Sequence, residues 1–183
     1  MVLSGIVLDQ AGRESFLVEQ QVVGGIISFA TSGPESRAKM VEVKRLAHKI
    51  RDAFEEIYRH QFKNPSSNPT LGGFCKRASV QFFIEAQRLG YDVRLVAADG
   101  HVYNVYDGHI IDITATQFGK TDRVWITKQI GNQTGYWQPK KNGNELSSLD
   151  ELYKAGWSSW SEEFNKDSEM VAKYLSENNE LCV

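Results

Sequence analysis

The sequence predicts an α+β protein in which helices pack on an antiparallel sheet. Apolar residues recur at helical spacing over two long stretches, Val43–Tyr58 and Phe74–Leu89. Strand-like runs follow between residues 91 and 115. They are separated by Asp99-Gly100 and Asp107-Gly108, dipeptides that favour tight hairpin turns. Two amphipathic helices followed by consecutive hairpin strands therefore indicate flanking helices on an antiparallel sheet.

The length and composition predict one soluble domain. With 183 residues, we expect a single domain over residues 1–183, with a core of about 35–130 and a C-terminal helical extension of about 145–183. Hydrophobic residues make up 41% of the chain and the net charge is −2, values that give no sign of a nucleic-acid partner or an anionic membrane. Acidic residues outnumber basic ones in the extension, and we expect them to form a solvated helical face rather than a docking surface.

The cysteines and the N-terminus bear on the compartment and on metals. Cys75 and Cys182 are the two cysteines, too few for a disulfide scaffold, so we expect free thiols in a reducing compartment. The four histidines have no metal-ligand spacing, and no nucleotide-binding loop is present, so we expect no metal and no cofactor. No cleavable signal or membrane span is visible. This favours synthesis in the cytoplasm, and export by a machine that cleaves no signal is compatible with the same sequence.

The elements follow in order from local signals. Short β-branched runs within residues 2–31 predict strands or a packed arm. Ser32-x-x-Glu35 is a capping box with Pro34 in the first turn, and it predicts the start of a helix that ends at the loop Asn64–Pro69. A second helix is predicted from Phe74 to Arg88, with Gly90 as its C-terminal stop.

Four strands and two further helices complete the prediction. The strands are expected at Tyr91–Ala97, His101–Tyr106, His109–Ala115 and Val124–Ile130. A polar, Gly-rich loop follows at Gly131–Asn144. Capping boxes at Ser148-x-x-Glu151 and Ser159-x-x-Glu162 predict a short helix and a closing helix near residues 160–177.

One group of residues points to chemistry. Cys75 lies at the start of the second predicted helix, in Gly72-Gly73-Phe74-Cys75, where the helix dipole favours a thiolate. His101 and Asp112 follow on two strands joined by the Asp107-Gly108 turn. A thiol, an imidazole and a carboxylate are the groups that a cysteine nucleophile needs, with the carboxylate fixing the tautomer of the ring.

Whether Asp112 reaches His101 depends on the register of this hairpin. Pairing about the turn places Val105 opposite Ile110 or His109, and a shift of one residue moves Asp112 to the other face. His109 is a competing base, but its place beside the turn predicts an exposed tip. His48 and His60 fall on the first predicted helix and are expected at its surface.

These residues carry a resemblance to a known family. Gly-Gly-Phe-Cys75 at a helix start, followed by the stretch from Gly100 to Phe118 with His101 and Asp112, resembles the transglutaminase-like branch of the papain-like cysteine enzymes. The resemblance covers residues 70–118, about a quarter of the chain. It implies a papain-like or transglutaminase-like core, with the nucleophile helix packed on the sheet. Lys76 and Tyr103 stand where many relatives carry an aromatic residue, often Trp, soon after the Cys or the His.

The resemblance implies acyl transfer through a thioester. Cys75 would attack a peptide or a glutamine or asparagine amide of a protein substrate, and water or an amine would resolve the acyl-enzyme, as in a protease, a deamidase or a transglutaminase. The backbone N–H of Cys75 would face the oxyanion, and a second donor is expected from Gln61, Asn64 or Asn68. Gln117 is an alternative residue for orienting His101. Four tryptophans, which we expect mainly in the core, could also line the cleft: Trp125, Trp137, Trp157 and Trp160.

Two alternative functions use the same residues. A catalytically inactive domain of this kind would bind a partner or a peptide in the same cleft. A thioester-dependent acyltransferase would keep the Cys75 nucleophile but take its acyl group from a thioester donor.

Overall fold

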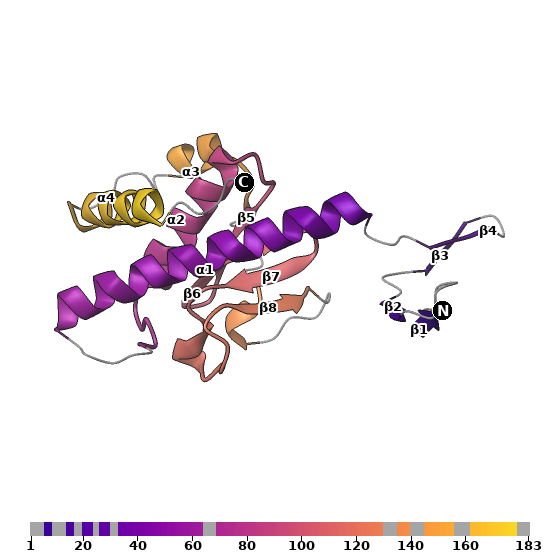
Figure 1. The fold of residues 1–183 in the computed structure, drawn as a ribbon, viewed down its shortest axis with the longest axis horizontal. Coiled ribbons are helices and arrows are strands. Elements are labelled where there is room, and N and C mark those ends of the chain that lie inside the picture. Colours follow the sequence, from indigo (N-terminus) through magenta and orange to yellow (C-terminus); the bar gives the residue numbers. More distant parts are fainter. Residues whose placement is uncertain are drawn as a thin grey trace. The chain divides into compact units, whose positions relative to one another are not determined.

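The computed structural model describes residues 6–8, 14–16, 20–23, 26–29, 33–63, 69–129, 135–139, 145–155 and 162–178 (Figure 1). The chain divides into two compact units, Met1–Val41 and Glu42–Val183, where the sequence predicts one domain. The first unit contains two antiparallel hairpins, as expected from its β-branched runs. They are formed by β1 (Ile6–Leu8) with β2 (Glu14–Phe16) and by β3 (Gln20–Val23) with β4 (Ile26–Phe29).

The second unit is an α+β structure built on a five-stranded antiparallel sheet in the order β8-β7-β6-β5-β9, which confirms the predicted class. Its strands are β5 (Arg94–Ala98), β6 (His101–Tyr106), β7 (His109–Asp112), β8 (Trp125–Lys128) and β9 (Glu145–Leu146). Its helices are α1 (Pro34–Phe62, shared with the first unit), α2 (Cys75–Arg88), α3 (Leu149–Lys154) and α4 (Glu162–Glu177), with 3₁₀ turns η1 (Ala115–Phe118) and η2 (Gly135–Trp137).

Most predicted boundaries are confirmed to within a few residues, and β7 is the main exception. The sequence predicts this strand to Ala115, but it ends at Asp112. The reason is a local turn in which Thr114 N–H donates to Asp112 Oδ1 at 2.8 Å, so the side chain of Asp112 takes the place of the strand's next ladder partner. The predicted Ser148 cap is confirmed, because its hydroxyl accepts from Glu151 N–H. The Ser159 cap lies outside the described residues.

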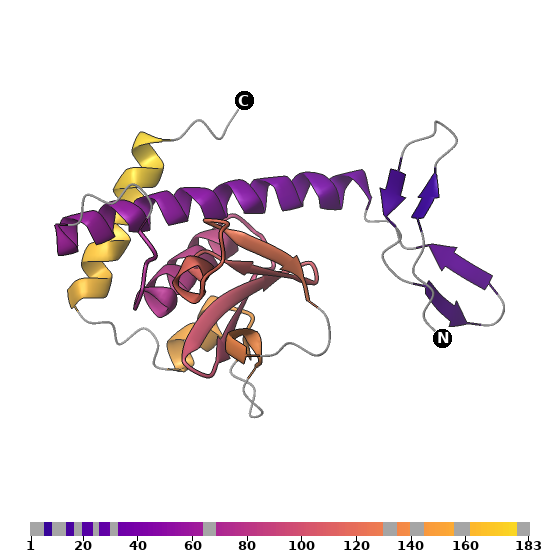
Figure 2. The same cartoon turned by 90° about the horizontal axis from the view of Figure 1, so that it is seen from below.

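The two faces of the sheet are covered differently. One face packs against α1 and α2 through residues such as Leu95, Val102 and Ile111, and this is the main hydrophobic core. The other face carries a smaller cluster that includes Tyr103 and Ile110, with two tryptophans packed against it. Figure 2 shows α1 lying along one side of the sheet. The second face is therefore the one that irregular segments cover.

A buried arginine connects α1 to two loops of the second unit. Arg51 is fully buried and pairs with Glu55 one turn later on α1 (Nε to Oε1, 2.7 Å). Its guanidinium also donates to Ile113 O and to Pro69 O. Because a buried guanidinium must satisfy its N–H groups, these bonds hold the loop before α2 and the loop after β7 at a fixed distance from α1.

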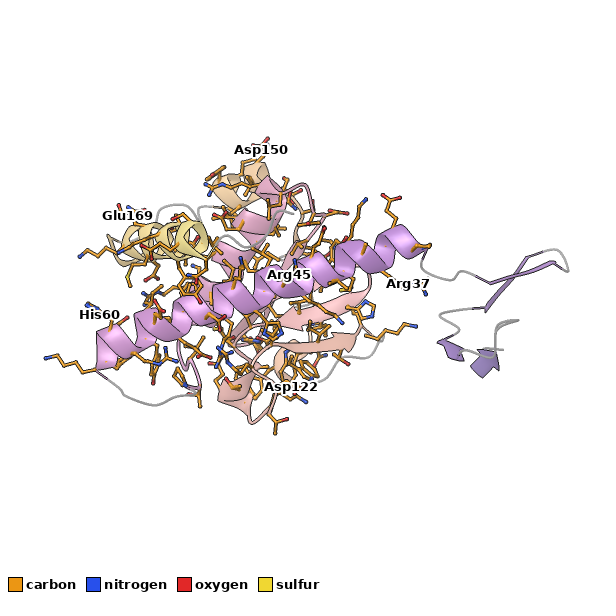
Figure 3. The ribbon with its side chains drawn as sticks, in the orientation of Figure 1. Arg37, Arg45, His60, Asp122, Asp150 and Glu169 are labelled. Atoms are coloured by element: carbon orange, nitrogen blue, oxygen red, sulfur yellow. The ribbon has the colours of Figure 1, made fainter. Side chains whose placement is uncertain are left out.

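The acidic C-terminal region is only partly the solvated face that the sequence predicts. Asp167 on α4 is buried and forms a bidentate ion pair with Arg77 on α2, so this carboxylate docks on the body of the protein. Other acidic side chains of this region are exposed, among them Asp150 and Glu169, which are labelled in Figure 3. None of the helices, over the residues that the structure describes, is long and apolar enough to cross a membrane.

Candidate active site

Cys75 is the first residue of α2, as the sequence predicts. A tight turn precedes it, in which Phe74 N–H donates to Leu71 O at 3.1 Å. Gly73 has a φ of +81°, a conformation that glycine adopts without steric cost. Buried Leu71 has a φ of +56°, which is strained for a leucine. No side chain caps the helix, so its first backbone N–H groups remain available beside the thiol.

Two hydrogen bonds fix α2 against β6. Ser79, one helical turn after Cys75, donates its hydroxyl to Val102 O at 2.8 Å. The side-chain amide of Asn104 donates to Ser79 O at 3.1 Å. The N–H of Val102 interacts with the Cys75 thiol. The face of α2 that carries Cys75 and Ser79 therefore lies along the first half of β6, directly beside His101.

The hairpin has the register that brings His101 and Asp112 together. Asn104 pairs with Ile111, and Val105 pairs with Ile110. Alternation then places Asp112 on the same face of the sheet as His101. His101 Nε2 lies 2.7 Å from Asp112 Oδ2, and both side chains are buried. Since a carboxylate only accepts, Nε2 carries the proton and Nδ1 is left to face the thiol.

Asp112 accepts three hydrogen bonds besides the one from His101 Nε2. Thr114 donates to Oδ1 through its backbone N–H at 2.8 Å and through its hydroxyl at 3.1 Å. The indole Nε1–H of Trp137, from η2, donates to Oδ2 at 2.8 Å. Trp137 is itself positioned because its carbonyl oxygen accepts from the Tyr103 hydroxyl at 2.8 Å. Both carboxylate oxygens are thus saturated, so Asp112 cannot turn away from the ring.

Aromatic side chains surround the imidazole. The Phe118 ring meets His101 edge to face at a centroid distance of 4.6 Å, and Trp137 lies at 6.2 Å. Tyr136, which is half exposed, stacks on Phe118 at 3.9 Å. Cys75 is half-buried, whereas His101 is 2% exposed and Asp112 is 0% exposed. The thiol is therefore the member of the group that a substrate could reach.

The electrostatics favour a thiolate and imidazolium pair. Burial raises the pKa of the Cys75 thiol, but the interaction with His101 and the backbone N–H groups of Val102 and Lys76 outweigh burial and lower that pKa. Burial lowers the pKa of His101, but the hydrogen bonds with Asp112 and with Cys75 outweigh it and raise that pKa to about 9. Nδ1 has no partner at regular hydrogen-bond geometry among the described residues, so its link to the sulfur is a loose one. A lowered thiol pKa beside a raised imidazole pKa favours transfer of the thiol proton to the ring.

We expect the pH dependence of alkylation to report this pair. Because the thiolate is stabilised, the rate of Cys75 alkylation by iodoacetamide should reach half its maximum at a pH below 9.0, the ordinary value for a cysteine. In His101→Ala the cation is lost while burial remains, so the midpoint should move to a higher pH than in the wild type. Mass spectrometry of the Cys75 and Cys182 peptides gives both rates in one sample, with Cys182 as the internal reference. Identical midpoints for wild type and His101→Ala would contradict the pairing.

The structure brings together Cys75, His101 and Asp112, the three residues singled out from the sequence. The other histidines lie elsewhere: His109 is at the Asp107-Gly108 tip and contacts Asp107 O, while His48 and His60 are exposed on α1. Gln61, expected as an oxyanion donor, is exposed, and its side-chain oxygen accepts from Arg77 at 3.5 Å. The other two expected donors, Asn64 and Asn68, lie outside the described residues, as do Trp157 and Trp160. Among the side chains that the structure describes, no group of three or more His, Cys, Asp or Glu residues could hold a metal ion.

Several residues of the site were not predicted. Trp137 packs against the smaller hydrophobic cluster, in line with the expected core position, but its bond to Asp112 was not predicted, and Phe118 was not assigned a role. The turn from Asp112 to Thr114 had a usable signal, because an Asp side chain commonly accepts from the backbone N–H two residues on. No local pattern predicts that a residue of the Gly131–Asn144 loop reaches Asp112 across the sheet.

Comparison of the chain with protein-family models, with curated proteins and with solved structures finds no match in any of the three.

Proposed function

We propose that the protein is a cysteine-nucleophile acyl-transfer enzyme of the papain-like, transglutaminase-like kind, acting as a protease or deamidase on an amide of a protein or peptide. The observation that carries the proposal is that His101 Nδ1 has no hydrogen-bond partner among the described residues. The Nε2 atom of the same ring is held by Asp112, and the neighbouring Cys75 thiol has a lowered pKa. A buried nitrogen left open beside a half-buried thiol is the arrangement that proton transfer to and from sulfur requires.

The reaction follows from these positions. The Cys75 thiolate attacks the amide carbon, the C–S bond forms, and the carbonyl electron pair moves to the oxygen. When the tetrahedral intermediate collapses, the C–N bond breaks and the leaving amine or ammonia takes the proton from the His101 imidazolium. A thioester on Cys75 remains. Neutral His101 then accepts a proton from water, which attacks the thioester and releases an acid, so that the thiolate is regenerated.

The surroundings of the thiol support an amide of a larger molecule as substrate. The Phe118 and Tyr136 rings form an apolar wall that extends from the imidazole to the surface. Gly72 and Gly73, in the turn that leads to Cys75, are exposed, and their lack of side chains leaves space over the backbone there. An extended peptide could lie between such a wall and an open backbone, with its carbonyl over the sulfur.

Mass spectrometry of candidate proteins and peptides, incubated with the wild type or with Cys75→Ala, tests the proposal. Cleavage indicates a protease, a mass shift from amide to acid indicates a deamidase, and a cross-link indicates transamidation. Cys182→Ser is the matched control and should retain the wild-type activity. The proposal is wrong if the wild type changes no substrate relative to Cys75→Ala and if Cys75 is alkylated no faster than Cys182. That outcome would favour the inactive peptide-binding domain, whereas stable acylation by a thioester donor with transfer to an amine would favour the acyltransferase.

A further inference from the structure

Gln117 carries an unpaired donor next to the turn that leads to Cys75. Three buried polar side-chain atoms lack a hydrogen-bond partner among the residues that the structure describes: His101 Nδ1, Asn104 Oδ1 and Gln117 Nε2. The first is the nitrogen that faces the thiol. Asn104 Oδ1 is an acceptor, whereas Gln117 Nε2 is an amide donor, and a buried N–H that binds nothing costs free energy. A bound ligand would supply the hydrogen-bond acceptor that such a donor lacks.

The orientation of the Gln117 amide is fixed by the backbone before Cys75. Gly73 N–H donates to Gln117 Oε1 at 3.4 Å. Turning the amide over would set two donors against each other, so the oxygen must face Gly73 and Nε2 must be the free end. Gly73 lies two residues before the nucleophile. The unpaired N–H is thereby attached to the same turn whose backbone leads into the open N–H groups of α2.

The 3₁₀ turn that carries Gln117 is anchored on both sides. Thr116 donates its hydroxyl to Thr70 O at 2.9 Å and accepts from buried Arg51 at 3.1 Å. Phe118 packs against His101. Gln117 lies between these two anchors, so its amide is placed before any substrate arrives. A preorganised donor of this kind is what stabilises a developing negative charge best, because little reorganisation accompanies the reaction.

We propose that Gln117 is a catalytic residue whose Nε2–H, together with the backbone N–H of Cys75, binds the oxyanion formed when the thiolate adds to a carbonyl. This inference rests on the proposed acyl-transfer function. In the addition step the electron pair of the C=O bond moves to the oxygen, which then accepts both N–H groups. When the intermediate collapses, that pair re-forms the C=O bond and the leaving group departs with the proton of His101. The substrate oxygen is the partner that Nε2 lacks.

Two reagents separate the oxyanion from the thiolate. Acylation of Cys75 by p-nitrophenyl acetate passes through a tetrahedral oxyanion, whereas alkylation by iodoacetamide does not. In Gln117→Ala we expect the acylation rate to fall at least about tenfold, since losing one oxyanion donor typically costs about 10²–10³ in kcat. The alkylation rate should stay within about threefold of wild type, because the thiolate is intact. The rates are read from nitrophenolate release and from the mass of the Cys75 peptide.

Gln117→Glu distinguishes a catalytic role from a structural one. Glutamate keeps an oxygen for Gly73 N–H but replaces the donor with a second acceptor, so its ratio of acylation to alkylation should fall at least as far as that of Gln117→Ala. The matched control is Gln129→Ala, which should match the wild type. Gln129 is a half-buried glutamine that follows β8 at the hairpin-tip end of the sheet, where its N–H donates to Gly108 O.

Three outcomes would overturn the inference. If Gln117→Glu matches the wild type while Gln117→Ala is slow, Gln117 only anchors Gly73. If both variants match the wild type, the unpaired N–H binds only water. In both cases the proposed function stands. If wild-type Cys75 is acylated no faster than Cys182 and is also alkylated no faster than Cys182, the proposed function is wrong. The proposed role of Gln117 is then wrong as well.

Discussion

Asp112→Asn is expected to lower the rate of acyl transfer by roughly 10²- to 10⁴-fold. The four bonds to Asp112 explain why an amide cannot replace the carboxylate here. Oδ2 accepts from His101 and Trp137, and Oδ1 accepts twice from Thr114. An asparagine has one oxygen, so its NH₂ group must face donors in either orientation. The variant also loses the charge that helps raise the pKa of His101 to about 9, and the imidazolium becomes harder to form.

The measurement is the acylation rate of Cys75 together with substrate turnover, each as a function of pH. The limb of the turnover profile that falls at high pH, as His101 loses its proton, should move to lower pH in Asp112→Asn, because its imidazolium is less stable. Asp107→Asn makes the same chemical change at the exposed tip of the same hairpin and should behave as the wild type. Turnover of Asp112→Asn within about threefold of wild type would show that the carboxylate is not needed.

Arg51→Met is expected to lower the free energy of unfolding by about 3–5 kcal/mol. Methionine fills much of the space but leaves Glu55 buried without its fully buried partner. It also leaves the carbonyl oxygens of Pro69 and Ile113 without the guanidinium. Arg59 and Arg123 still reach Glu55, so the loss should fall at the lower end of this range.

Urea unfolding followed by circular dichroism measures this loss. Arg45→Met removes an exposed arginine from the same helix and should change the free energy of unfolding by less than about 0.5 kcal/mol. Because Arg51 holds the loops on both sides of the site, the alkylation rate of Cys75 should also fall in Arg51→Met under native conditions. An unfolding free energy within about 1 kcal/mol of wild type would mean that the buried ion pair contributes little net stability.

The sheet and its helices could be predicted because their signals are local. The two Asp-Gly turns fix hairpins, and the helical spacing of Val43–Tyr58 and Phe74–Leu89 fixes amphipathic helices. The short β9 could not be predicted, because two residues carry no strand pattern of their own. It is a strand only because it pairs with Leu95 and Val96 of β5. β7 ends early because the Asp112 side chain bonds the backbone N–H of Thr114 in place of a strand partner. Hydrophobic alternation gives no information about such a side-chain bond.

The residues of the site also divide into those that local signals predict and those that only the packed fold brings together. His101 and Asp112 lie on one hairpin, so their proximity follows from the turn between them. Cys75 begins α2 and meets them through the packing of α2 on β6. Trp137 and Arg51 reach the site from distant parts of the chain, and only the packed fold brings them there. From the sequence, Gln117 is an alternative residue for orienting His101, but the orientation of its amide depends on a contact with Gly73, which lies 44 residues earlier.

The contact of Ser79 with β6 has a consequence for how this scaffold could diversify. An α-helix turns by roughly 100° per residue, so a small rotation of α2 would swing the thiol away from the imidazole. Ser79, bonded to β6 through both its hydroxyl and its carbonyl, resists that rotation although it takes no part in the chemistry. The direction of the Cys75 thiol therefore depends on a helix–strand contact as well as on the loops around it. Loop positions that bond none of the three site residues can therefore change their sequence, and with it the substrate they admit, without turning the thiol away from the imidazole.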